Sequence, residues 1–564
     1  MIWNTANRAV EDANKSARPG ALFDSLFLGG FECANHLTLD GHRMDVIAAT
    51  QHDRFAADDY ARCRSVGIRA VREAARWPIT DRRGRVDVSE VRRLARLGRD
   101  HGLTLIWDLL HYGYPDDLDP TAERFADDFV DRLRTFAAAV ARVVQQESDG
   151  PAWYTPVNEI SYTAWAAGDV GILSPFWHGR GWEYKVLLVR AAIAAFDAIR
   201  SIDPTARVLS AEPLVRLHVH PAVVDERERR DLQRGADDFN QRVVSEAYDM
   251  LAGRIVPELG GSREHLGVVG VNYYEGNQWT IATPSLPQHF LGRDDPAWVP
   301  LRSLLRELSD RFGGPIVISE TGSTAHSRPG WFRHLVEEAE GALQSGVDLQ
   351  GICLYPIVTS PDWNDPTAFF EGGLWDVEPQ PDGSLQRVLA PELAEALHEA
   401  QRRLDPASVT DALVSASESP RPEPDLVFAN PFELARFSPD GFVSVPLFAG
   451  DSVVGDMYCL EPGKSVAGHR HSKTEHVITT IRGSGDIRIG ERWVVLREGQ
   501  SVLVPEGVYH GVHNPTTERL IVQQISSPKP WDARFGGPRP SDLRIAPDPG
   551  PQSDGEQTSL ERLD

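Results

Sequence analysis

The sequence predicts an α/β protein made of a (β/α)8 TIM barrel followed by a small all-β domain. Over residues 1–404, short apolar runs alternate with stretches whose apolar residues recur at helical spacing. Residues 426–530 instead show strand-like runs separated by glycine turns, which is typical of a jelly roll. Residues 405–425 are rich in Pro, Ser, Glu and Asp, so we expect a linker there. Residues 531–564 have the composition of a disordered tail.

Eight candidate strands fall in the first domain, with helix-like segments such as residues 184–204 between them. In chain order they are SLFLGGFE (25–32), IRAVREA (68–74), LTLIWDLL (103–110), AWYTPVN (152–158), RVLSAEP (207–213), LGVVGVNYY (266–274), PIVISE (315–320) and QGICLYP (350–356). Eight β/α units over nearly 400 residues fit a (β/α)8 barrel with long loops. A doubly wound sheet is the structural alternative, but it does not require eight strands with polar ends.

Composition limits the classes of partner. The net charge is −24 and no block of Lys or Arg occurs, which argues against nucleic acid and against anionic membrane surfaces. No stretch of about 18 apolar residues is present to span a bilayer, and the first residues contain no apolar run typical of a signal peptide. The four cysteines have no framework spacing. We therefore expect a cytoplasmic protein and leave open whether it forms a homo-oligomer.

Two glutamates stand where a barrel enzyme keeps its catalytic groups. Active residues of (β/α)8 barrels lie at the carboxyl ends of the strands. Asn158 and Glu159 end the fourth candidate strand, and Glu320 ends the seventh. Paired carboxyl groups on either side of a scissile bond are what glycoside hydrolysis requires.

The strand ends, taken in order, resemble family 1 of the glycoside hydrolases, the β-glucosidase type. The family's TFNEP is similar to TPVNEI (155–160), its TENG to SETG (319–322), its LYHWDLP to LLHYGYP (109–115), its YRFSISW to VREAARW (71–77) and its WSLLDNFEW to YPIVTSPDW (355–363), while its NYY is intact at 272–274. The resemblance extends over about residues 21–390. It implies a retaining β-glycosidase acting on a small carbohydrate or glycoside.

The resemblance also implies a role for each matching residue. Glu159 would be the acid/base and Glu320 the nucleophile. The supporting and sugar-binding residues would be Asn158 for the 2-hydroxyl, Arg72 and Tyr274 for keeping Glu320 ionised, and His111, Asp362 and Trp363 for the other hydroxyls. A carboxylate beside an arginine keeps its charged form, as a nucleophile needs, and a second carboxyl facing that anion has its pKa raised, as an acid needs.

Several positions depart from the family. The usual glutamine after the first strand is absent, and Glu32, Asn35 and His36 are the candidates for its place. Glu73 follows Arg72 and would add a carboxylate near the barrel mouth. Other replacements are Tyr112 and Tyr355 for tryptophans and Asp362 for a glutamate. The loop TSPDWNDP (359–366) contains no cation for a phosphate, so we expect a neutral glycoside rather than a 6-phospho-glycoside.

Three other functions stay open. The barrel could be degenerate and bind or sense a carbohydrate without turnover, or it could transfer a glycosyl group with the same residues. The protein could also be bifunctional, with the small domain acting on the released sugar or aglycone.

The small domain resembles the cupin superfamily. Its first motif reads Gly463-x5-His469-x-His471-x3-Glu475 and is followed by Gly483. The second runs from Gly499 through His510 to Asn514. The first motif has one residue more than usual between Glu475 and Gly483.

The cupin resemblance implies that His469, His471, Glu475 and His510 bind one divalent metal. Mn, Fe, Ni, Co and Zn all accept imidazole and carboxylate ligands, so the identity of the metal stays open. Hydrolysis by two carboxyl groups would not need this ion.

Overall fold

The computed structural model describes residues 20–527 apart from 284–285, 287, 411–429, 440, 450–452 and 472–473. The chain divides into two compact units, Met1–Asp425 and Leu426–Asp564. Within the described residues, no helix is both long and apolar enough to cross a bilayer.

The first unit contains a closed barrel of eight parallel strands, and this confirms the predicted fold class. The strands are β1 (Phe27–Gly30), β4 (Ala70–Ala74), β7 (Thr104–Leu110), β8 (Trp153–Val157), β9 (Arg207–Pro213), β11 (Val268–Asn272), β13 (Ile316–Thr321) and β14 (Leu349–Leu354). Each lies within one of the eight apolar runs or overlaps it. The barrel closes where β1 pairs with both β14 and β4.

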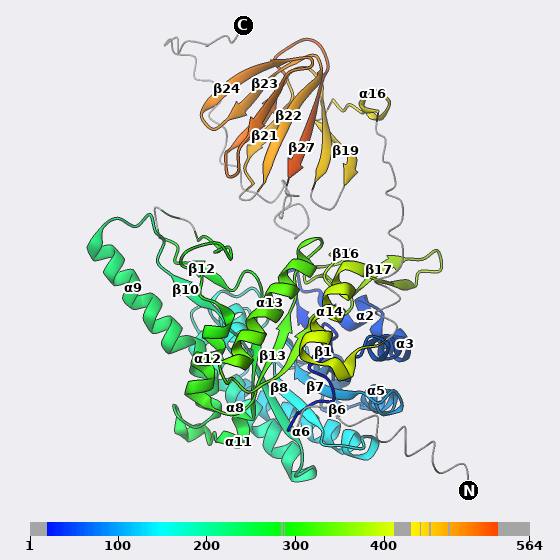
Figure 1. Cartoon of the computed structure of the whole chain (residues 1–564), viewed down its shortest axis with the longest axis vertical. Helices are drawn as coiled ribbons and strands as arrows, with labels where there is room; N and C mark the ends of the chain where they lie inside the picture. Colours follow the sequence, from blue (N-terminus) through cyan, green and yellow to red (C-terminus); the bar gives the residue numbers. More distant parts are fainter. Residues whose placement is uncertain are drawn as a thin grey trace. The chain divides into compact units, whose positions relative to one another are not determined.

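Helices surround the barrel (Figure 1). The longer ones are α3 (His52–Ser65), α5 (Ser89–Asp100), α6 (Phe125–Glu147), α8 (Gly181–Ile202), α9 (Glu226–Gln241), α12 (Leu301–Phe312), α13 (Ser327–Gln344) and α14 (Pro391–Leu404). Their apolar faces pack on the outside of the strands in one large buried cluster. A separate cluster fills the interior and takes one residue from each strand: Leu28, Ala70, Ile106, Trp153, Leu209, Val268, Val317 and Cys353. These two layers of packing hold the strand ends in fixed positions.

Alternation along β4 decides which of its charged residues reaches the barrel interior. Arg72 lies two residues after Ala70 and therefore shares its inward face. Glu73 points outward to α3, where its Oε2 contacts Nε2 of His52 at 2.9 Å and accepts a 2.6 Å hydrogen bond from Tyr60. The expectation that Glu73 adds a carboxylate near the barrel mouth is therefore wrong.

The second unit contains a five-stranded and a four-stranded antiparallel sheet. The first has the order β19 (Val443–Ala449), β20 (Val454–Leu460), β27 (Leu520–Ser527), β22 (Glu475–Arg482) and β25 (Ser501–Val504). The second has the order β21 (Ser465–His469), β26 (His510–His513), β23 (Ser484–Ile489) and β24 (Arg492–Arg497). Residues of both sheets share one buried apolar cluster. This is the all-β domain that the sequence predicts.

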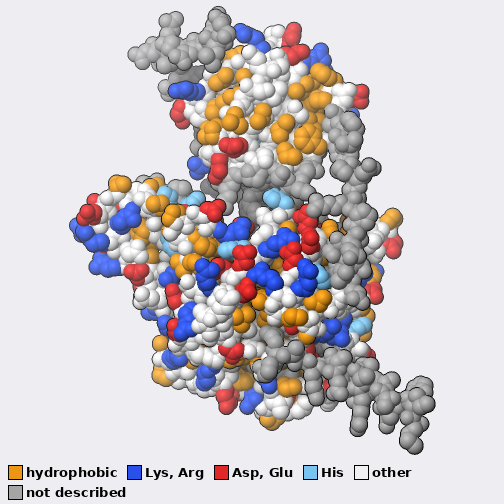
Figure 2. All heavy atoms as spheres, in the orientation of Figure 1, with side chains coloured by type: hydrophobic (Ala, Val, Ile, Leu, Met, Phe, Trp, Pro, Cys, Tyr) orange, Lys and Arg blue, Asp and Glu red, His pale blue; other side chains and the backbone are white. Residues whose placement is uncertain are grey.

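The surfaces of the two units differ. Hydrophobic side chains gather on the face of the second unit that is in view, whereas the barrel unit shows mixed charge (Figure 2). Val477 and Leu503 form a cross-strand pair between β22 and β25 and are 39% and 55% exposed.

The barrel unit extends past the boundary expected from composition. Asp405 and Ser408 are buried, and Oδ2 of Asp405 accepts a 2.7 Å hydrogen bond from the backbone N of Leu26. Thr410 bonds to the carbonyl of Ser65. Residues 405–410 therefore pack on the barrel. The rest of the expected linker, residues 411–425, and the expected tail, residues 531–564, lie outside the described residues.

Candidate active site and candidate metal centre

A buried arginine organises the carboxyl ends of the barrel strands. Nη1 of Arg72 donates a 2.6 Å hydrogen bond to Oε1 of Glu320. Its Nη2 donates to Oδ2 of Asp108 at 2.6 Å and to Oδ1 of Asn158 at 2.8 Å. Arg72 is 0% exposed, so its charge is offset by these carboxylates rather than by water. Strands β4, β7, β8 and β13 are thereby joined at one point.

A β-bulge brings Glu320 into this group. The register between β11 and β13 shifts so that Val271 pairs with Ile318 but Asn272 pairs with Glu320. A bulge changes the direction in which the side chains after it point. Oε2 of Glu320 accepts a 2.8 Å hydrogen bond from the hydroxyl of Tyr274. Both oxygens of this carboxylate are therefore bound by donors.

Glu159 lies at a strained turn between β8 and the short helix α7 (Ile160–Thr163). Its φ of 48° is in the left-handed region that non-glycine residues seldom adopt, and its N–H bonds to the carbonyl of Ala211 at 2.8 Å. Its carboxyl accepts hydrogen bonds from the hydroxyl of Tyr112 at 2.5 Å and from Nδ2 of Asn272 at 2.9 Å. Strain at such a position is frequent in active sites.

The protonation of Glu159 is set by its surroundings. Burial and the charge of Glu320 raise the pKa of Glu159 to about 7, although the bonds from Tyr112 and Asn272 oppose this. Glu159 is 7% exposed. It can therefore carry a proton near neutral pH, whereas an exposed glutamate cannot.

His111 connects the residues bonded to Arg72 with the end of β1. Its Nδ1 lies 3.2 Å from Oδ2 of Asp108, and its Nε2 lies 3.1 Å from Nδ2 of Asn158. Oε1 of Glu32 lies 3.7 Å from the same Nε2 and accepts a hydrogen bond from Tyr355 at 3.3 Å. Of the three candidates for the missing glutamine, Glu32 is thus the one whose carboxyl group faces the ring of His111, whereas Asn35 donates its backbone N–H to the carbonyl of His111 at 3.1 Å. Burial raises the pKa of Glu32.

The loop after β14 places the ring of Trp363 beside Tyr112. The ring centroid of Trp363 lies 5.0 Å from that of Tyr112, and its carbonyl is 3.0 Å from Nε2 of His36. Asp362 is held within its own turn, where Oδ1 accepts a 2.8 Å hydrogen bond from the N–H of Asn364. The structure therefore places Trp363 beside the tyrosine that holds Glu159, while the contact given for Asp362 is local.

Four supporting residues were not assigned a role from sequence. Asp108 binds both Arg72 and His111, Asn272 and Tyr112 hold Glu159, and Ser319 fixes the amide of Asn272 through a 2.7 Å bond to its Oδ1. A signal existed for Asp108, because it is the one charged residue within the apolar run LTLIWDLL.

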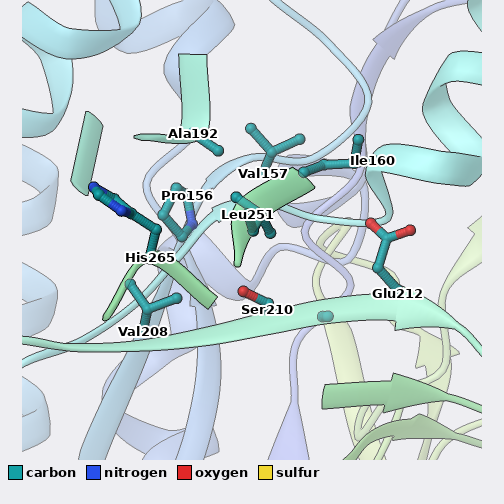
Figure 3. A pocket seen from close by; sticks show the side chains of 10 residues that line it. Pro156, Val157, Ile160, Ala192, Val208, Ser210, Glu212, Leu251 and His265 are labelled. Carbon is teal, nitrogen blue, oxygen red and sulfur yellow. The ribbon is translucent and has the colours of Figure 1, made fainter. Parts of the chain in front are cut away.

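A small cavity is lined by residues of β8, β9 and α8, among others (Figure 3). Its volume of about 10 Å³ is at most that of one water molecule. Glu212 lines it, and burial raises the pKa of Glu212 to about 7. Oε2 of Glu212 accepts a 3.0 Å hydrogen bond from the N–H of Ser161, two residues after Glu159. Glu212 thus supports the turn that carries Glu159.

The second unit brings three of the four expected metal ligands together. One ring nitrogen from each of His469, His471 and His510 lies within 4.8 Å of the others. Nδ1 of His469 is 3.0 Å from the carbonyl of Ala467, and Nδ1 of His510 is 3.0 Å from that of Val508. A carbonyl can only accept, so Nδ1 carries the proton in both rings and Nε2 is left as the metal-binding atom.

The buried His510 has the protonation state that a metal requires. Burial, together with neighbouring His469 and His471, lowers the pKa of His510 to about 4, and its ring is therefore neutral at neutral pH. Its Nε2 is buried and makes no hydrogen bond with the described residues. These three residues fit a divalent metal.

Glu475 is the expected ligand that the structure does not bring to this group. It begins β22 and is exposed, whereas the next residue, His476, is buried. The ring centroid of His476 lies 4.8 Å from that of His471 and 4.6 Å from that of His510. Because successive strand residues point to opposite faces, only one of Glu475 and His476 can face the cluster, and it is His476.

A family comparison agrees with this architecture. The family described as "Cupin domain" matches residues 456–525. The C-terminal unit contains a cupin domain over these residues. A mannose-1-phosphate guanylyltransferase from Sinorhizobium fredii is 37% identical over 69 residues, which are 12% of this chain and 13% of that protein. The chain therefore spans only a small part of that relative.

Solved structures resemble the barrel. A β-glucosidase from Thermotoga maritima in complex with a substituted glucoimidazole is 15% identical, with a TM-score of 0.54, over 70% of this chain and 100% of that one. The AHE enzyme from Alicyclobacillus herbarius is 16% identical, with a TM-score of 0.50, over 63% of this chain and 87% of that one. At these identities the likeness shows the fold alone. The barrel thus shares its fold with these structures and is followed in the same chain by the cupin domain.

Proposed function

We propose that the barrel is a retaining β-glycosidase with Glu159 as acid/base and Glu320 as nucleophile. The observation that carries this proposal is that the two carboxyl groups lie at one end of the barrel in opposite environments. Glu320 is bound by a cation and a hydroxyl. Glu159 is bound by neutral donors, and its pKa is raised to about 7. Two carboxyl groups with such different environments are the arrangement that glycoside hydrolysis uses.

In the first step, Glu159 donates its proton to the glycosidic oxygen while Glu320 attacks the anomeric carbon. The bond to the aglycone breaks, and a covalent glycosyl–enzyme forms with Glu320. In the second step, the ionised Glu159 takes a proton from water, which displaces Glu320 and releases the sugar. Arg72 and Tyr274 would stabilise Glu320 as it leaves.

The substrate that we propose is a neutral β-linked glycoside. Three side chains would bind sugar hydroxyls beside Glu320: those of Asn158, His111 and Glu32. Asn158 bonds to Arg72, His111 contacts Asn158, and Glu32 lies beside His111. Trp363 would contact the sugar ring next to Tyr112. A phosphate would meet Asp362 and Asp365 in the loop after β14, which has no cation of its own. Turnover of 6-phospho-glycosides should therefore be slower than that of neutral ones.

The test is a panel of aryl β-glycosides, neutral and 6-phosphorylated, with NMR detection of the first anomer released. The β anomer is expected. Glu159→Gln should lower kcat/KM by about 10²–10⁴-fold on substrates with poor leaving groups, and Glu320→Gln should abolish turnover. Glu275→Gln, at an exposed carboxyl just after Tyr274, is the matched control and should keep the parent rate.

Two outcomes would reject the proposal: no cleavage by the parent chain, or an unaffected Glu320→Gln variant. In the first case, a sugar that binds without turnover would favour a carbohydrate-sensing barrel. An excess of glycosylated acceptor over free sugar would instead indicate transglycosylation.

The cupin domain supports a second function, the binding of one divalent metal by His469, His471 and His510. The support is that one ring nitrogen from each of these residues lies within 4.8 Å of the others. In His469 and His510, Nδ1 bonds to a backbone carbonyl, which leaves Nε2 for the metal. Such an ion supplies a Lewis acid and open coordination positions. Metal analysis of the full-length chain tests this directly, with about one ion per chain expected. A second step on the released sugar or aglycone is compatible with this site.

A further inference from the structure

The cluster in the cupin domain contains a fourth imidazole. His476 is 1% exposed and follows Glu475 on β22. Its ring lies 4.8 Å from His471 and 4.6 Å from His510, measured between centroids. The rings of His469 and His510 are also 4.6 Å apart. The separation between the rings of His476 and His510 is thus the same as that between two members of the expected ligand set.

Nδ1 of His476 is held by side chains of the neighbouring strand β27. It lies 2.8 Å from Oγ of Ser526 and 3.3 Å from Nε2 of Gln524. In His469 and His510 the Nδ1 atom is likewise held by an oxygen of the protein. Outer partners of this kind fix the orientation of a metal-binding ring and direct Nε2 to the metal.

The sequence spacing agrees with the geometry. Counted from Glu475, the first motif has one residue too many before Gly483. Counted from His476, the extra residue moves to the segment between His471 and β22, and the distance to Gly483 becomes the usual one. A residue added between strands leaves their faces unchanged, whereas one added within a strand reverses them.

Another carboxylate does not replace Glu475 from the same sheet. Asp456 on β20 pairs with Gln524 on β27, which pairs with Ile478 on β22. Asp456 therefore shares the inner face with His476 but is two strands away, which is about 10 Å across the sheet. It faces the same side of the sheet without reaching an ion bound by the four rings.

We propose that His476, and not Glu475, is the fourth protein ligand, so that the metal is bound by four neutral imidazoles. This deepens the proposed metal-binding function of the cupin domain and rests on it. Four nitrogen ligands favour Fe, Co, Ni or Zn over Mn, which prefers oxygen. With no carboxylate in the set, the ion keeps its full double charge. The open positions therefore select an anionic chelating ligand, such as a carboxylate or an enolate, over a neutral hydroxyl compound.

The first experiment measures Zn²⁺ and Co²⁺ binding to the full-length apo protein. His476→Ala should weaken binding of both ions at least tenfold and change the visible spectrum of the Co²⁺ form. Glu475→Gln, one residue away, is the matched control and should leave both unchanged. Far-UV circular dichroism checks that each variant is folded, and His476→Gln, which keeps a polar side chain of similar reach, replaces the alanine variant if that one unfolds.

The second experiment titrates the Co²⁺ protein with oxalate and with glycerol. Oxalate should perturb the spectrum at a concentration at least tenfold lower than glycerol. His476→Glu, which restores a carboxylate ligand, should retain Co²⁺ and weaken oxalate binding about tenfold. Equal responses to oxalate and glycerol would overturn the ligand class that we propose.

The outcomes separate the two levels of the proposal. A parent chain that binds neither ion would reject the metal site itself and the fourth ligand with it. A parent that binds metal, together with a His476→Ala variant that binds it equally well, would overturn only the role of His476. Loss of metal from Glu475→Gln would return the fourth position to Glu475.

Discussion

The hydroxyl of Tyr112 donates a 2.5 Å hydrogen bond to Oε2 of Glu159. Tyr112 follows β7 and Glu159 follows β8, so neighbouring strand ends of the barrel set the properties of the proposed acid. The bond stabilises the ionised carboxylate, while burial and the charge of Glu320 act in the opposite direction and raise its pKa. The balance between them places the pKa of Glu159 at about 7.

Removal of this hydrogen bond should move the alkaline limit of activity upward. The acid must be protonated in the first step, so kcat/KM falls as the pH rises through its pKa. Tyr112→Phe lowers the stability of the carboxylate, and we expect the alkaline limb of the pH profile to shift to higher pH. Tyr162→Phe is the control, because its ring lies 5.3 Å from that of Tyr112 without a hydrogen bond to Glu159. A limb that shifts downward in Tyr112→Phe would contradict this assignment.

Arg72→Met should damage both stability and activity. It leaves the carboxylates of Asp108 and Glu320 buried without their cation, which costs about 3–5 kcal/mol in the free energy of unfolding. We expect activity to fall at least about 100-fold, since Glu320 loses one of its two donors. Urea unfolding and initial rates measure the two effects.

The matched control for Arg72→Met is Arg333→Met. Arg333 forms a 2.9 Å bond to Glu399 with both side chains about 40% exposed, and such a surface pair contributes less than about 1 kcal/mol. Equal losses of stability in the two variants would show that the Arg72 group is not a buried charge network.

A second buried network lies outside the barrel and predicts a pH-dependent stability. His52 contacts Asp59 and Glu73 at 2.9 Å each, and Arg387 bonds to Asp59. Burial opposes the charge of His52, but the two carboxylates outweigh it and raise the pKa of His52 to about 9. Because the folded pKa is above the unfolded value of 6.5, this stabilisation is complete below pH 6.5 and is lost as the pH rises through 9.

His52→Gln should therefore destabilise the protein most at low pH. A difference of this size in pKa corresponds to about 3 kcal/mol in the free energy of unfolding. The difference between parent and variant, measured by urea unfolding, should be largest at pH 6 and shrink toward pH 10. A difference that grows with pH would contradict the assigned charge state.

The barrel should hydrolyse glycosides without the cupin domain and without metal. A chain truncated after Asp425 retains the contacts of Asp405 and Thr410 with the barrel, whereas one truncated after Leu404 loses them. We expect full activity from the first in the presence of EDTA and a lower midpoint of urea unfolding for the second. Loss of activity in the longer chain would show that the barrel depends on the cupin domain.

The sequence by itself determined the elements and the residues at their ends. All eight barrel strands were predicted because each is an apolar run between helix-like segments, and these runs and the residues just after them supplied Glu159, Glu320, Arg72 and His111. Alternation along a strand predicted that His469 and His471 share a face, whereas His510 was assigned through the resemblance to the second cupin motif. The strands and the Glu159/Glu320 pair needed only local periodicity and the rule that barrel strands end at the active face, whereas the roles of the other residues came from the family resemblances.

Only the tertiary structure decided how those residues are paired. The bonds from Tyr112 and Asn272 to Glu159 join strands far apart in sequence, and the bulge that turns Glu320 toward Arg72 is a property of the β11–β13 register. Glu73 and Glu475 were assigned to the wrong face because a strand reverses its faces with a shift of one residue. Local sequence cannot say where a strand begins after a turn, since the packing of its neighbours fixes that register.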